Sequence, residues 1–211
     1  MTKDCSIYIL GAGGHAKVVI SALQATGKTV KALFDDDSEK WGQALWGYPV
    51  LGPISEFDPF SGLASLIAVG DNRLRRGMAV RFRQAEWETI VHPAAFVDSS
   101  ARLGPGTVVF AGAVIQPDAV IGAHCIINTG ATIDHDCVLG DFVHVAPGCH
   151  IGGGVALAEG VFLGIGGTVI PGKRVGFWTT VGAGGVVTND LPANVLAVGV
   201  PAKLVKIMTN Q

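Results

Sequence analysis

An aliphatic residue recurs at every sixth position along the second half of the chain, from Val91 to Val187, without a gap. A helix repeats its buried positions about every 3.6 residues and a strand every second residue, so neither element produces a clean period of six. A repeat this short predicts a coil that stacks on copies of itself, with each rung burying its aliphatic residue against the next rung. The seventeen anchors are Val91, Val97, Leu103, Val109, Ile115, Ile121, Ile127, Ile133, Leu139, Val145, Ile151, Leu157, Leu163, Val169, Val175, Val181 and Val187.

A small residue stands two positions before many of these anchors: Ala95, Ala101, Thr107, Ala113, Ala119, Cys125, Ala131 and Cys137. Both residues would point into the coil, the larger filling the interior and the smaller fitting near a corner. Glycine follows the anchor at Gly104, Gly122, Gly140 and Gly176, which are separated by multiples of eighteen residues. Three hexads are therefore expected to make one triangular turn, which gives between five and six turns in all. The alternative is a β-sandwich rich in valine and glycine, which would need all seventeen matches to arise by chance.

The first part of the chain shows a strand, a glycine turn and a helix in succession. An apolar run at residues 6–10 enters the segment G-A-G-G-H-A-K, and helix-like residues 18–25 follow. The segment satisfies the pattern G-x-G-x-x-G/A through Gly11, Gly13 and Ala16, which leaves backbone N–H groups open to a phosphate at the start of a helix. Taken alone this pattern is weak evidence, because many tight strand-to-helix turns need glycine.

Two further predicted strands end at residues suited to the same site. The strand over residues 29–34 ends in Asp35 and Asp36, about twenty residues after the glycines, where an acidic side chain could bind a ribose hydroxyl. The strand over residues 64–69 ends at Gly70 and precedes a basic helix. Open parallel sheets bind ligands at the carboxyl ends of their strands, so we expect these residues to share one nucleotide site.

The number of elements limits the kind of ligand. Only about 85 residues precede the coil, enough for one mononucleotide-binding half but not for two, so a nucleotide or nucleotide sugar fits better than NAD. We therefore predict a Rossmann-like α/β nucleotide-binding domain over residues 1–88, followed by a β-helical coil over residues 89–211. On the basic helix, Arg73, Arg75 and Arg76 could meet a phosphate, but a solvated helix face is the expected arrangement.

Composition limits the partners and the location of the protein. The formal net charge is −2 and no cluster of Lys and Arg is present, so we expect neither a nucleic-acid partner nor a membrane surface as partner. No apolar run reaches the roughly 18 residues that span a bilayer. The first six residues carry charges and no apolar segment of a signal peptide, so a cytoplasmic location is expected.

The four cysteines do not suggest a metal site or a disulfide. Cys125, Cys137 and Cys149 all occupy the small inward position of the hexad, where they would behave as small buried hydrophobic residues. No C-x-x-C is present, and nothing else indicates an oxidising compartment. We predict that these cysteines have a packing role and that no metal is bound.

The segment with the strongest chemical signal surrounds His135, which lies two residues after its anchor Ile133 and between Asp134 and Asp136. A neighbouring carboxylate stabilises imidazolium and selects the tautomer, which makes this histidine a candidate general base. Successive side chains of a strand point to opposite faces, so Asp136 could orient His135 only across a corner. The hexad phase places a corner there.

A second histidine suggests that the site is shared between subunits. His144 is nine residues after His135, half of an eighteen-residue turn, so one chain would present the two side chains on different faces. Asn128 is expected near His144, on the same face one turn away. If both histidines serve one site, neighbouring subunits must supply them, and a three-sided coil then favours a homotrimer.

These motifs, together with the final A-V-G-V-P-A-K segment, make nearly the whole chain similar to the hexapeptide-repeat acyltransferases. Within them, the chain resembles the bacterial sugar O- and N-acetyltransferases of the sialic acid O-acetyltransferase type. The resemblance implies a left-handed parallel β-helix and acetyl-CoA as co-substrate, with no permanently bound cofactor. It also implies direct transfer of the acetyl group to the amine of a nucleotide-linked amino sugar, of the UDP-4-amino-4,6-dideoxysugar or GDP-perosamine type.

The resemblance also assigns roles to residues. It makes His135 the catalytic base and Asp136 the acid that raises its basicity, although some members have glutamate at the latter position. It implies a polar contact from Asn128 to the sugar. The implied nucleotide contacts are Gly13, Gly14, His15, Asp35, Asp36 and Gly70. The implied acetyl-CoA contacts are His144, Gly153, Ile165 and Ala183.

Three alternatives stay open. The acceptor could be a hydroxyl of a sialic acid or another sugar, or the chain could be a non-catalytic scaffold that binds a nucleotide sugar. The same coil also occurs in zinc-dependent hydratases of the γ-carbonic anhydrase type, which need three converging histidines, two of them five residues apart. Here the histidines of the coil are separated by 11, 9 and 6 residues, which disfavours that third reading: His124, His135, His144 and His150.

Overall fold

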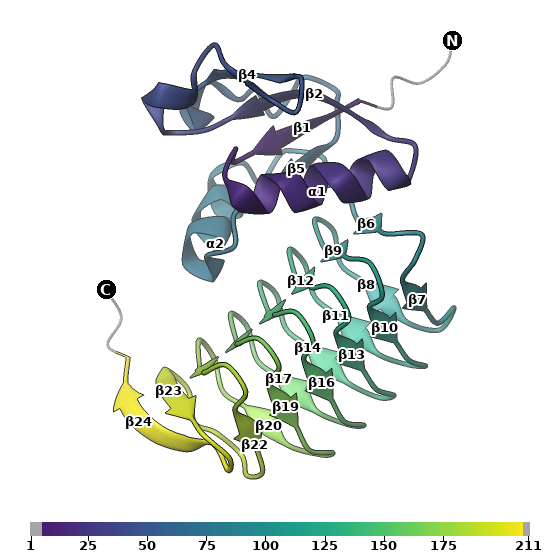
Figure 1. The fold of residues 1–211 in the computed structure, drawn as a ribbon, viewed down its shortest axis with the longest axis vertical. Helices are drawn as coiled ribbons and strands as arrows, with labels where there is room; N and C mark the ends of the chain where they lie inside the picture. The colour runs from purple at the N-terminus through teal and green to yellow at the C-terminus, as the bar shows by residue number, and fades with distance from the viewer. Residues whose placement is uncertain (1–5, 209–211) are drawn as a thin grey trace. The chain divides into compact units, whose positions relative to one another are not determined.

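The computed structural model describes residues 6–208 and divides the chain into two compact units, Met1–His92 and Pro93–Gln211 (Figure 1). The division falls four residues after the boundary expected from the sequence. No helix of residues 6–208 is long and apolar enough to cross a membrane.

The first unit is a small α/β structure around one sheet of strand order β3-β4-β2-β1-β5. Strand β1 pairs in parallel with β2 and β5, and β2 pairs in parallel with β4, whereas the short β3 is antiparallel to β4. The strands are β1 (Ser6–Leu10), β2 (Thr29–Phe34), β3 (Ala44–Leu45), β4 (Tyr48–Gly52) and β5 (Ser65–Ile67). The helices are α1 (Gly14–Ala25) and α2 (Asn72–Arg81), with short 3-10 turns η1 (Ser38–Lys40) and η2 (Ile54–Glu56).

The parallel strands bury apolar residues on both faces, as the apolar runs predict. Ile9, Leu10 and Leu33 are fully buried, and helix α1 contributes Val19 and Ile20 to the same core. The glycine turn, the acidic segment after β2 and the segment after β5 all follow carboxyl ends of parallel strands, so they lie at one edge of the sheet.

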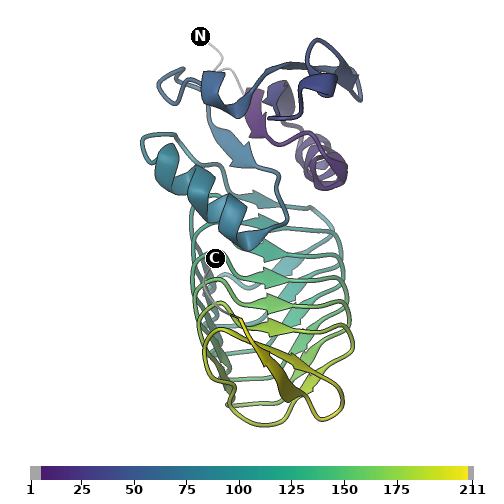
Figure 2. The ribbon, with the colours of Figure 1, turned by 90° about the vertical axis from the view of Figure 1, so that its left-hand side faces the viewer.

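The hexad region folds into a parallel coil. Within the part of the chain that the structure describes, it holds seventeen two-residue strands, one for each anchor. They are β6 (Ile90–Val91), β7 (Phe96–Val97), β8 (Arg102–Leu103), β9 (Val108–Val109), β10 (Val114–Ile115), β11 (Val120–Ile121), β12 (Ile126–Ile127), β13 (Thr132–Ile133), β14 (Val138–Leu139), β15 (His144–Val145), β16 (His150–Ile151), β17 (Ala156–Leu157), β18 (Phe162–Leu163), β19 (Thr168–Val169), β20 (Arg174–Val175), β21 (Thr180–Val181) and β22 (Val186–Val187). An antiparallel pair, β23 (Val195–Val198) and β24 (Lys203–Ile207), follows them at the end of the coil (Figure 2).

Each strand pairs in parallel with the strand three further along, so one turn takes eighteen residues. Ile115 pairs with Ile133, and Ile133 pairs with Ile151. The strands therefore form three separate ladders along the coil, one of which faces the viewer in Figure 2. This confirms the prediction of three hexads per turn.

The inward positions are filled as the sequence predicts. From Val109 to Val187 every anchor is at most 2% exposed, whereas the anchors of the first turn are only partly buried. Cys125, Cys137 and Cys149 are fully buried at the small inward position. Their thiols donate to backbone carbonyl oxygens one turn away, from Cys125 to Gly140 at 3.2 Å, from Cys137 to Gly152 at 3.2 Å and from Cys149 to Gly164 at 3.1 Å.

Burial should make these three thiols unreactive in the native protein. Burial raises the pKa of Cys137 and Cys149, so little of the reactive thiolate forms. We expect each of them to react slowly with a thiol reagent before unfolding and rapidly after it, as followed by peptide mapping, which separates them from Cys5 outside the described residues. Rapid native labelling of any of the three would contradict the hexad phase.

Candidate functional site

His135 lies at the corner between β13 and β14, as the hexad phase predicts. Asp136 has a positive φ of 58°, and this turn brings two consecutive side chains to the same side of the chain. The Nδ1 atom of His135 is 2.7 Å from Oδ2 of Asp136. Asp134 closes the turn from the other side, because its Oδ1 accepts the backbone N–H of His135 at 2.8 Å. Both members of the His135–Asp136 pair are exposed, by 60% and 66%.

The two carboxylates determine the state of the imidazole. The hydrogen bond to Asp136 raises the pKa of His135, and the charge of Asp134 raises it further. Because Asp136 can only accept a hydrogen bond when ionised, the neutral ring carries its proton on Nδ1. The lone pair then lies on Nε2, which faces away from Asp136 and is the atom able to take a proton from a ligand.

Gly153 lies against the imidazole ring of His135 and leaves space for it. It lies one turn after His135, and a Cβ atom added to Gly153 would lie 2.7 Å from both Cε1 and Nε2 of that ring. The next residue, Gly154, donates its backbone N–H to the carbonyl oxygen of His135 at 2.9 Å. Glycine is therefore required at position 153 to leave room for the imidazole in this position.

Asn128 and His144 form a second group, on another part of the coil. The Nδ2 atom of Asn128 is 3.4 Å from Nε2 of His144, as expected from their places one turn apart. His144 points away from the coil interior in β15, yet it is only 9% exposed and packs edge-on against the ring of Phe162, with centroids 5.1 Å apart. The side chain of His144 thus has the outward direction expected from the hexads, although little of it is exposed. Phe162 lies eighteen residues after His144 and pairs with it, so the register itself places this ring against the imidazole.

Two further residues assigned by resemblance are exposed at one corner of the coil. Ile165 is 64% exposed, and its carbonyl oxygen accepts the N–H of Gly184 at 2.8 Å, which places Ala183 on the next turn of the same corner. Within a single chain, the described contacts join His135 to Asp136 and Gly153, and Asn128 to His144, but they do not join these two groups.

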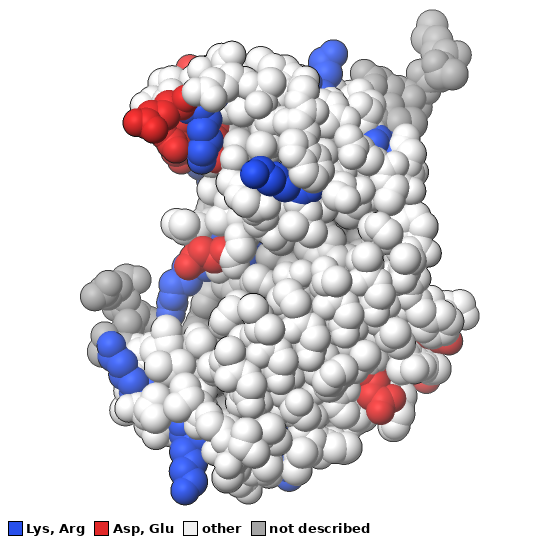
Figure 3. Space-filling view, in the orientation of Figure 1, with Lys and Arg blue, Asp and Glu red and all other residues white. Residues whose placement is uncertain are grey.

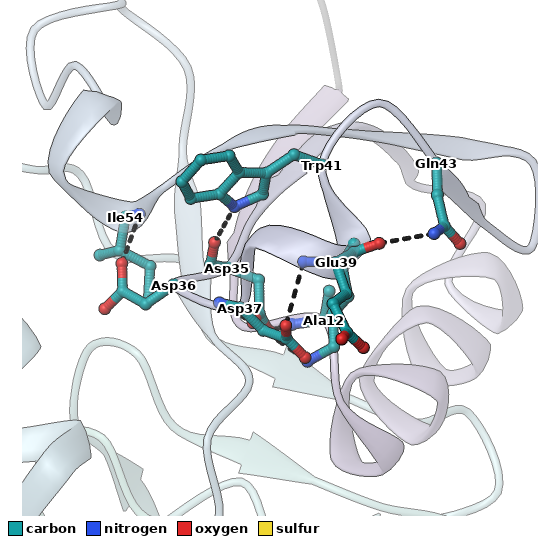
Figure 4. Close-up of polar contacts among 9 residues, drawn as sticks. Ala12, Asp35, Asp36, Asp37, Glu39, Trp41, Gln43 and Ile54 are labelled. Atoms are coloured by element: carbon teal, nitrogen blue, oxygen red, sulfur yellow. Dashed lines mark hydrogen bonds and ion pairs between the residues drawn. The ribbon is translucent and has the colours of Figure 1, made fainter.

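In the first unit, Asp35 ties the glycine turn to the strand beside it. Its Oδ2 accepts the backbone N–H of Ala12 at 2.6 Å, and its Oδ1 accepts the N–H of Asp37 and the ammonium of Lys40, both at 3.0 Å. Burial alone would raise the pKa of Asp35, but these three donors lower it overall. Figure 4 shows the neighbouring contacts, including Trp41, whose indole N–H donates to the carbonyl oxygen of Asp35 at 2.7 Å.

The sequence predicts Asp35 and Asp36 as ribose contacts, but it does not reveal that both carboxylates already accept hydrogen bonds from backbone N–H groups. Asp36 Oδ1 accepts the N–H of Ile54 at 2.9 Å, which fixes the start of η2 (Figure 4). Any ligand at this edge of the sheet must therefore share these oxygens with the protein.

A hollow of about 250 Å³ opens beside the glycine turn. Gly13 and Gly14 are exposed, and a Cβ atom at either would meet nothing within 4 Å, so the backbone there is open to a ligand. Lys17 and Lys40 add positive charge to the wall of the hollow, a feature that the sequence analysis missed. Lys17 lies inside the segment G-A-G-G-H-A-K, and its position there could have indicated this positive charge. The lining residues are Ala12, Gly13, Gly14, Lys17, Lys40, Gln43, Ala44, Leu45 and Val50.

His15 and Arg75 complete this edge. The pKa of His15 is lowered to about 4, first by burial and then by the positive charge of Arg75, so the imidazole is neutral at pH 7. The solvated position expected for Arg75 is wrong, because this side chain is only 1% exposed and its guanidinium binds the carbonyl oxygen of Gly70 at 3.1 Å. Arg73 and Arg76 are exposed, as expected.

Charge is sparse elsewhere. In Figure 3 the visible side of the coil is largely uncharged, with isolated acidic groups near one edge and basic groups near the opposite edge. Among residues 6–208, no group of three or more His, Cys, Asp or Glu side chains is placed to hold a metal ion.

Comparison with known proteins identifies the family. Residues 6–82 match the PglD N-terminal domain, and residues 100–135 match the bacterial transferase hexapeptide repeats. The structure is similar to a mutant form of perosamine N-acetyltransferase from Caulobacter crescentus, solved with CoA and GDP-perosamine, at 45% identity and a TM-score of 0.89. That match covers 95% of this chain and 97% of the other. The chain belongs to the hexapeptide-repeat sugar acetyltransferases.

Two further relatives support membership of this acetyltransferase family. The acetyltransferase domain of PglB from Neisseria gonorrhoeae is 35% identical, with a TM-score of 0.88 over 95% of this chain and 99% of that one. UDP-N-acetylbacillosamine N-acetyltransferase from Bacillus subtilis is 40% identical over 114 residues, which are 50% of this chain and 51% of that protein. An uncharacterised protein of Acanthamoeba polyphaga mimivirus, L142, is also similar, at 32% identity, but the match covers only 21% of its length. The chain therefore spans about half the length, or less, of these two curated relatives.

The contact between Gly153 and His135 can be tested directly. We expect Gly153→Ala to push the ring away from Asp136, which weakens their hydrogen bond and lowers the pKa of His135 toward its ordinary value. Histidine titration by NMR measures this shift. Gly77→Ala is the matched control, because a Cβ atom there meets nothing within 4 Å. An unchanged pKa of His135 in Gly153→Ala would show that Gly153 does not set the ring position.

Proposed function

We propose that the protein is an acetyl-CoA-dependent N-acetyltransferase that acts on a nucleotide-linked amino sugar. The observation that carries this proposal is the exposed His135–Asp136 pair, joined at 2.7 Å. It lies in a chain that is 45% identical, over nearly its full length, to an enzyme named for N-acetylation of perosamine. The binding residues named below are part of the same proposal.

The chemistry follows from the protonation state of His135. Its Nε2 takes a proton from the sugar amine as the amine nitrogen attacks the thioester carbonyl carbon of acetyl-CoA. The carbon–sulfur bond then breaks, and His135 returns the proton to the departing sulfur, so the products are the acetamido sugar and CoA. Backbone N–H groups stabilise the transient oxyanion. No covalent acyl-enzyme is required, because Cys125, Cys137 and Cys149 are buried inside the coil.

Each unit is assigned its own binding residues. In the first unit, the open backbone of Gly13 and Gly14 with the ammonium groups beside it suits a diphosphate. His15, Asp35, Asp36 and Gly70 surround the nucleotide. The coil supplies the acetyl-transfer residues: Asn128 for the sugar, and His144, Gly153, Ile165 and Ala183 for acetyl-CoA.

We also propose that the working enzyme is a homotrimer. His135 lies at the corner between β13 and β14, whereas the Asn128–His144 pair belongs to β15 and the corner before β13, so one rigid chain presents them on different sides. A site that uses both groups therefore requires residues from two subunits, and a three-sided coil accommodates three equivalent interfaces. A cytoplasmic location fits a protein that uses acetyl-CoA. The product is a nucleotide sugar for a glycosyl-transfer step in glycan or lipopolysaccharide synthesis.

Removal of the base should abolish most of the activity. We expect His135→Ala to lower kcat by about 100-fold or more, the usual contribution of a general base, while the coil stays folded by circular dichroism. UDP- and GDP-linked amino sugars, with hydroxyl analogues beside them, are the acceptors to assay with acetyl-CoA and a thiol reporter. Activity of His135→Ala within a few-fold of wild type would remove this residue from the mechanism. Turnover only with hydroxyl acceptors would replace N-acetylation by O-acetylation.

Asp136→Asn should change the pH profile of the same assay. His135 acts as a base only when neutral, so activity rises with pH through its pKa, which the hydrogen bond to Asp136 holds above the ordinary value. Loss of that carboxylate lowers the pKa, and we expect the acid limb of kcat/KM to move to lower pH, with a smaller loss of kcat than in His135→Ala. A limb that stays in place would contradict the assigned role of Asp136.

The shared site can be tested by mixing subunits. We expect His135→Ala and His144→Trp proteins, each confirmed to be poorly active alone, to recover activity when their subunits exchange, because some interfaces then carry both native histidines. Subunit exchange is verified by mass spectrometry of the assembled oligomer. A fully active monomer in analytical ultracentrifugation, or no recovery after verified exchange, would refute the shared site.

A further inference from the structure

Arg75 is a charged residue of the first unit with a buried side chain. It comes from helix α2, at the edge of the sheet that carries the glycine turn, and it is only 1% exposed. Burial of a guanidinium is costly unless hydrogen bonds compensate for the lost water. Its neighbours Arg73 and Arg76 on the same helix are exposed, so the buried position is particular to Arg75.

The guanidinium binds the turn that joins β5 to α2. Its Nη1 donates to the carbonyl oxygens of Val69 and Gly70, at 3.0 and 3.1 Å, and its Nη2 donates to Oδ1 of Asn72 at 2.7 Å. Because the donors of arginine form a rigid planar fork, three acceptors spread over four residues are held in one arrangement. The turn cannot move without breaking these contacts.

The glycine turn rests on this segment. Gly11 has a φ of +106°, and a Cβ atom there would lie 2.9 Å from the carbonyl oxygen of Ala68 and 3.0 Å from Cγ2 of Val69. The N–H of Ala68 donates to the carbonyl oxygen of Leu10 at 2.7 Å, which ties the two carboxyl strand ends together. The guanidinium thus acts on the glycine turn through the backbone of residues 68–70.

We propose that Arg75 is a positioning residue of the nucleotide-sugar site, which holds the β5–α2 turn so that the glycine turn presents its backbone to the ligand's diphosphate in one geometry. The ligand class rests on the function proposed above. The role of Arg75 is to order the residues that touch the ligand, so it contributes mainly to binding of the nucleotide half.

Arg75 also acts on His15 by its charge. The imidazole of His15 is largely buried on helix α1, and after burial the positive charge of Arg75, from helix α2, is the second cause of its lowered pKa of about 4. A neutral imidazole offers the ligand one hydrogen-bond donor and one acceptor, and it keeps that form through the physiological range of pH.

Two substitutions separate the positioning of the turn from the charge. Arg75→Met removes both, so we expect the pKa of His15 to rise. We also expect the affinity for GDP or UDP to fall by about tenfold or more, because binding must then pay the cost of ordering the turn. Arg75→Lys keeps the charge but not the planar fork, so the pKa of His15 should stay low while the affinity still falls. Arg76→Met, an exposed neighbour on the same helix, is the control expected to change neither.

The measurements are histidine titration by NMR and calorimetry with GDP and UDP, followed by KM for the nucleotide sugar and for acetyl-CoA. KM for acetyl-CoA should not change in any variant. Wild-type affinity in Arg75→Lys would overturn the positioning role, and so would equal losses in Arg75→Met and Arg76→Met. If Arg75→Met does not fold, Arg75→Lys still decides the positioning role.

These experiments distinguish an error in the proposed function from an error in the role of Arg75. If neither GDP nor UDP binds wild type, the nucleotide ligand is wrong, but the pKa of His15 still tests the arrangement around Arg75. An unchanged pKa of His15 in folded Arg75→Met would overturn the electrostatic link whatever the ligand.

Discussion

The parallel pairing of each strand with the strand eighteen residues later is the constraint on which the coil depends. It stacks the anchors into continuous columns, so each aliphatic side chain is covered by the equivalents before and after it. Two-residue strands have little stability of their own, and burial between successive turns supplies it. The same pairing places Gly153 above His135. The chemical site is thus a local departure in a regular stack, with its geometry set by the stack.

The coil could be predicted in detail because its period is a geometric requirement that every turn must satisfy. The inward positions of the cysteines and the corner at His135 follow from counting along the hexads. The pairing of His144 with Phe162 also follows from the eighteen-residue register, whereas the angle between the two rings and the low exposure of His144 depend on side-chain conformations that the period does not specify.

The first unit was predictable only in outline. Its alternation of strands, glycine turn and helix indicated the sheet and the edge that could bind a ligand. The partners of individual side chains were not visible, because Asp35 binds the N–H of a residue 23 positions earlier and Arg75 resembles its exposed neighbours in sequence. A strand-end acid suggests a ligand contact, and a basic helix suggests a solvated face. Here tertiary contacts overrule both suggestions.

Two histidines show how the surroundings move the pKa of one residue type in opposite directions. His135 is exposed beside two carboxylates, which raise its pKa, whereas His15 is mostly buried and close to a guanidinium, and its pKa is lowered. The first environment favours proton uptake and suits a base that must take a proton and return it. The second excludes a charge and suits a group that recognises a ligand by hydrogen bonds alone.

The eighteen-residue register also limits how such a protein can change during evolution. A residue inserted within a strand would shift the inward and outward positions of that strand against its ladder partners, whereas a whole duplicated turn leaves all strands in phase. Each added turn lengthens the coil by one strand spacing, about 4.8 Å. Residues on the same ladder keep their lateral alignment through such a step. A binding surface built along the coil can thus adapt to a longer or shorter ligand by discrete increments, without redesign of the core.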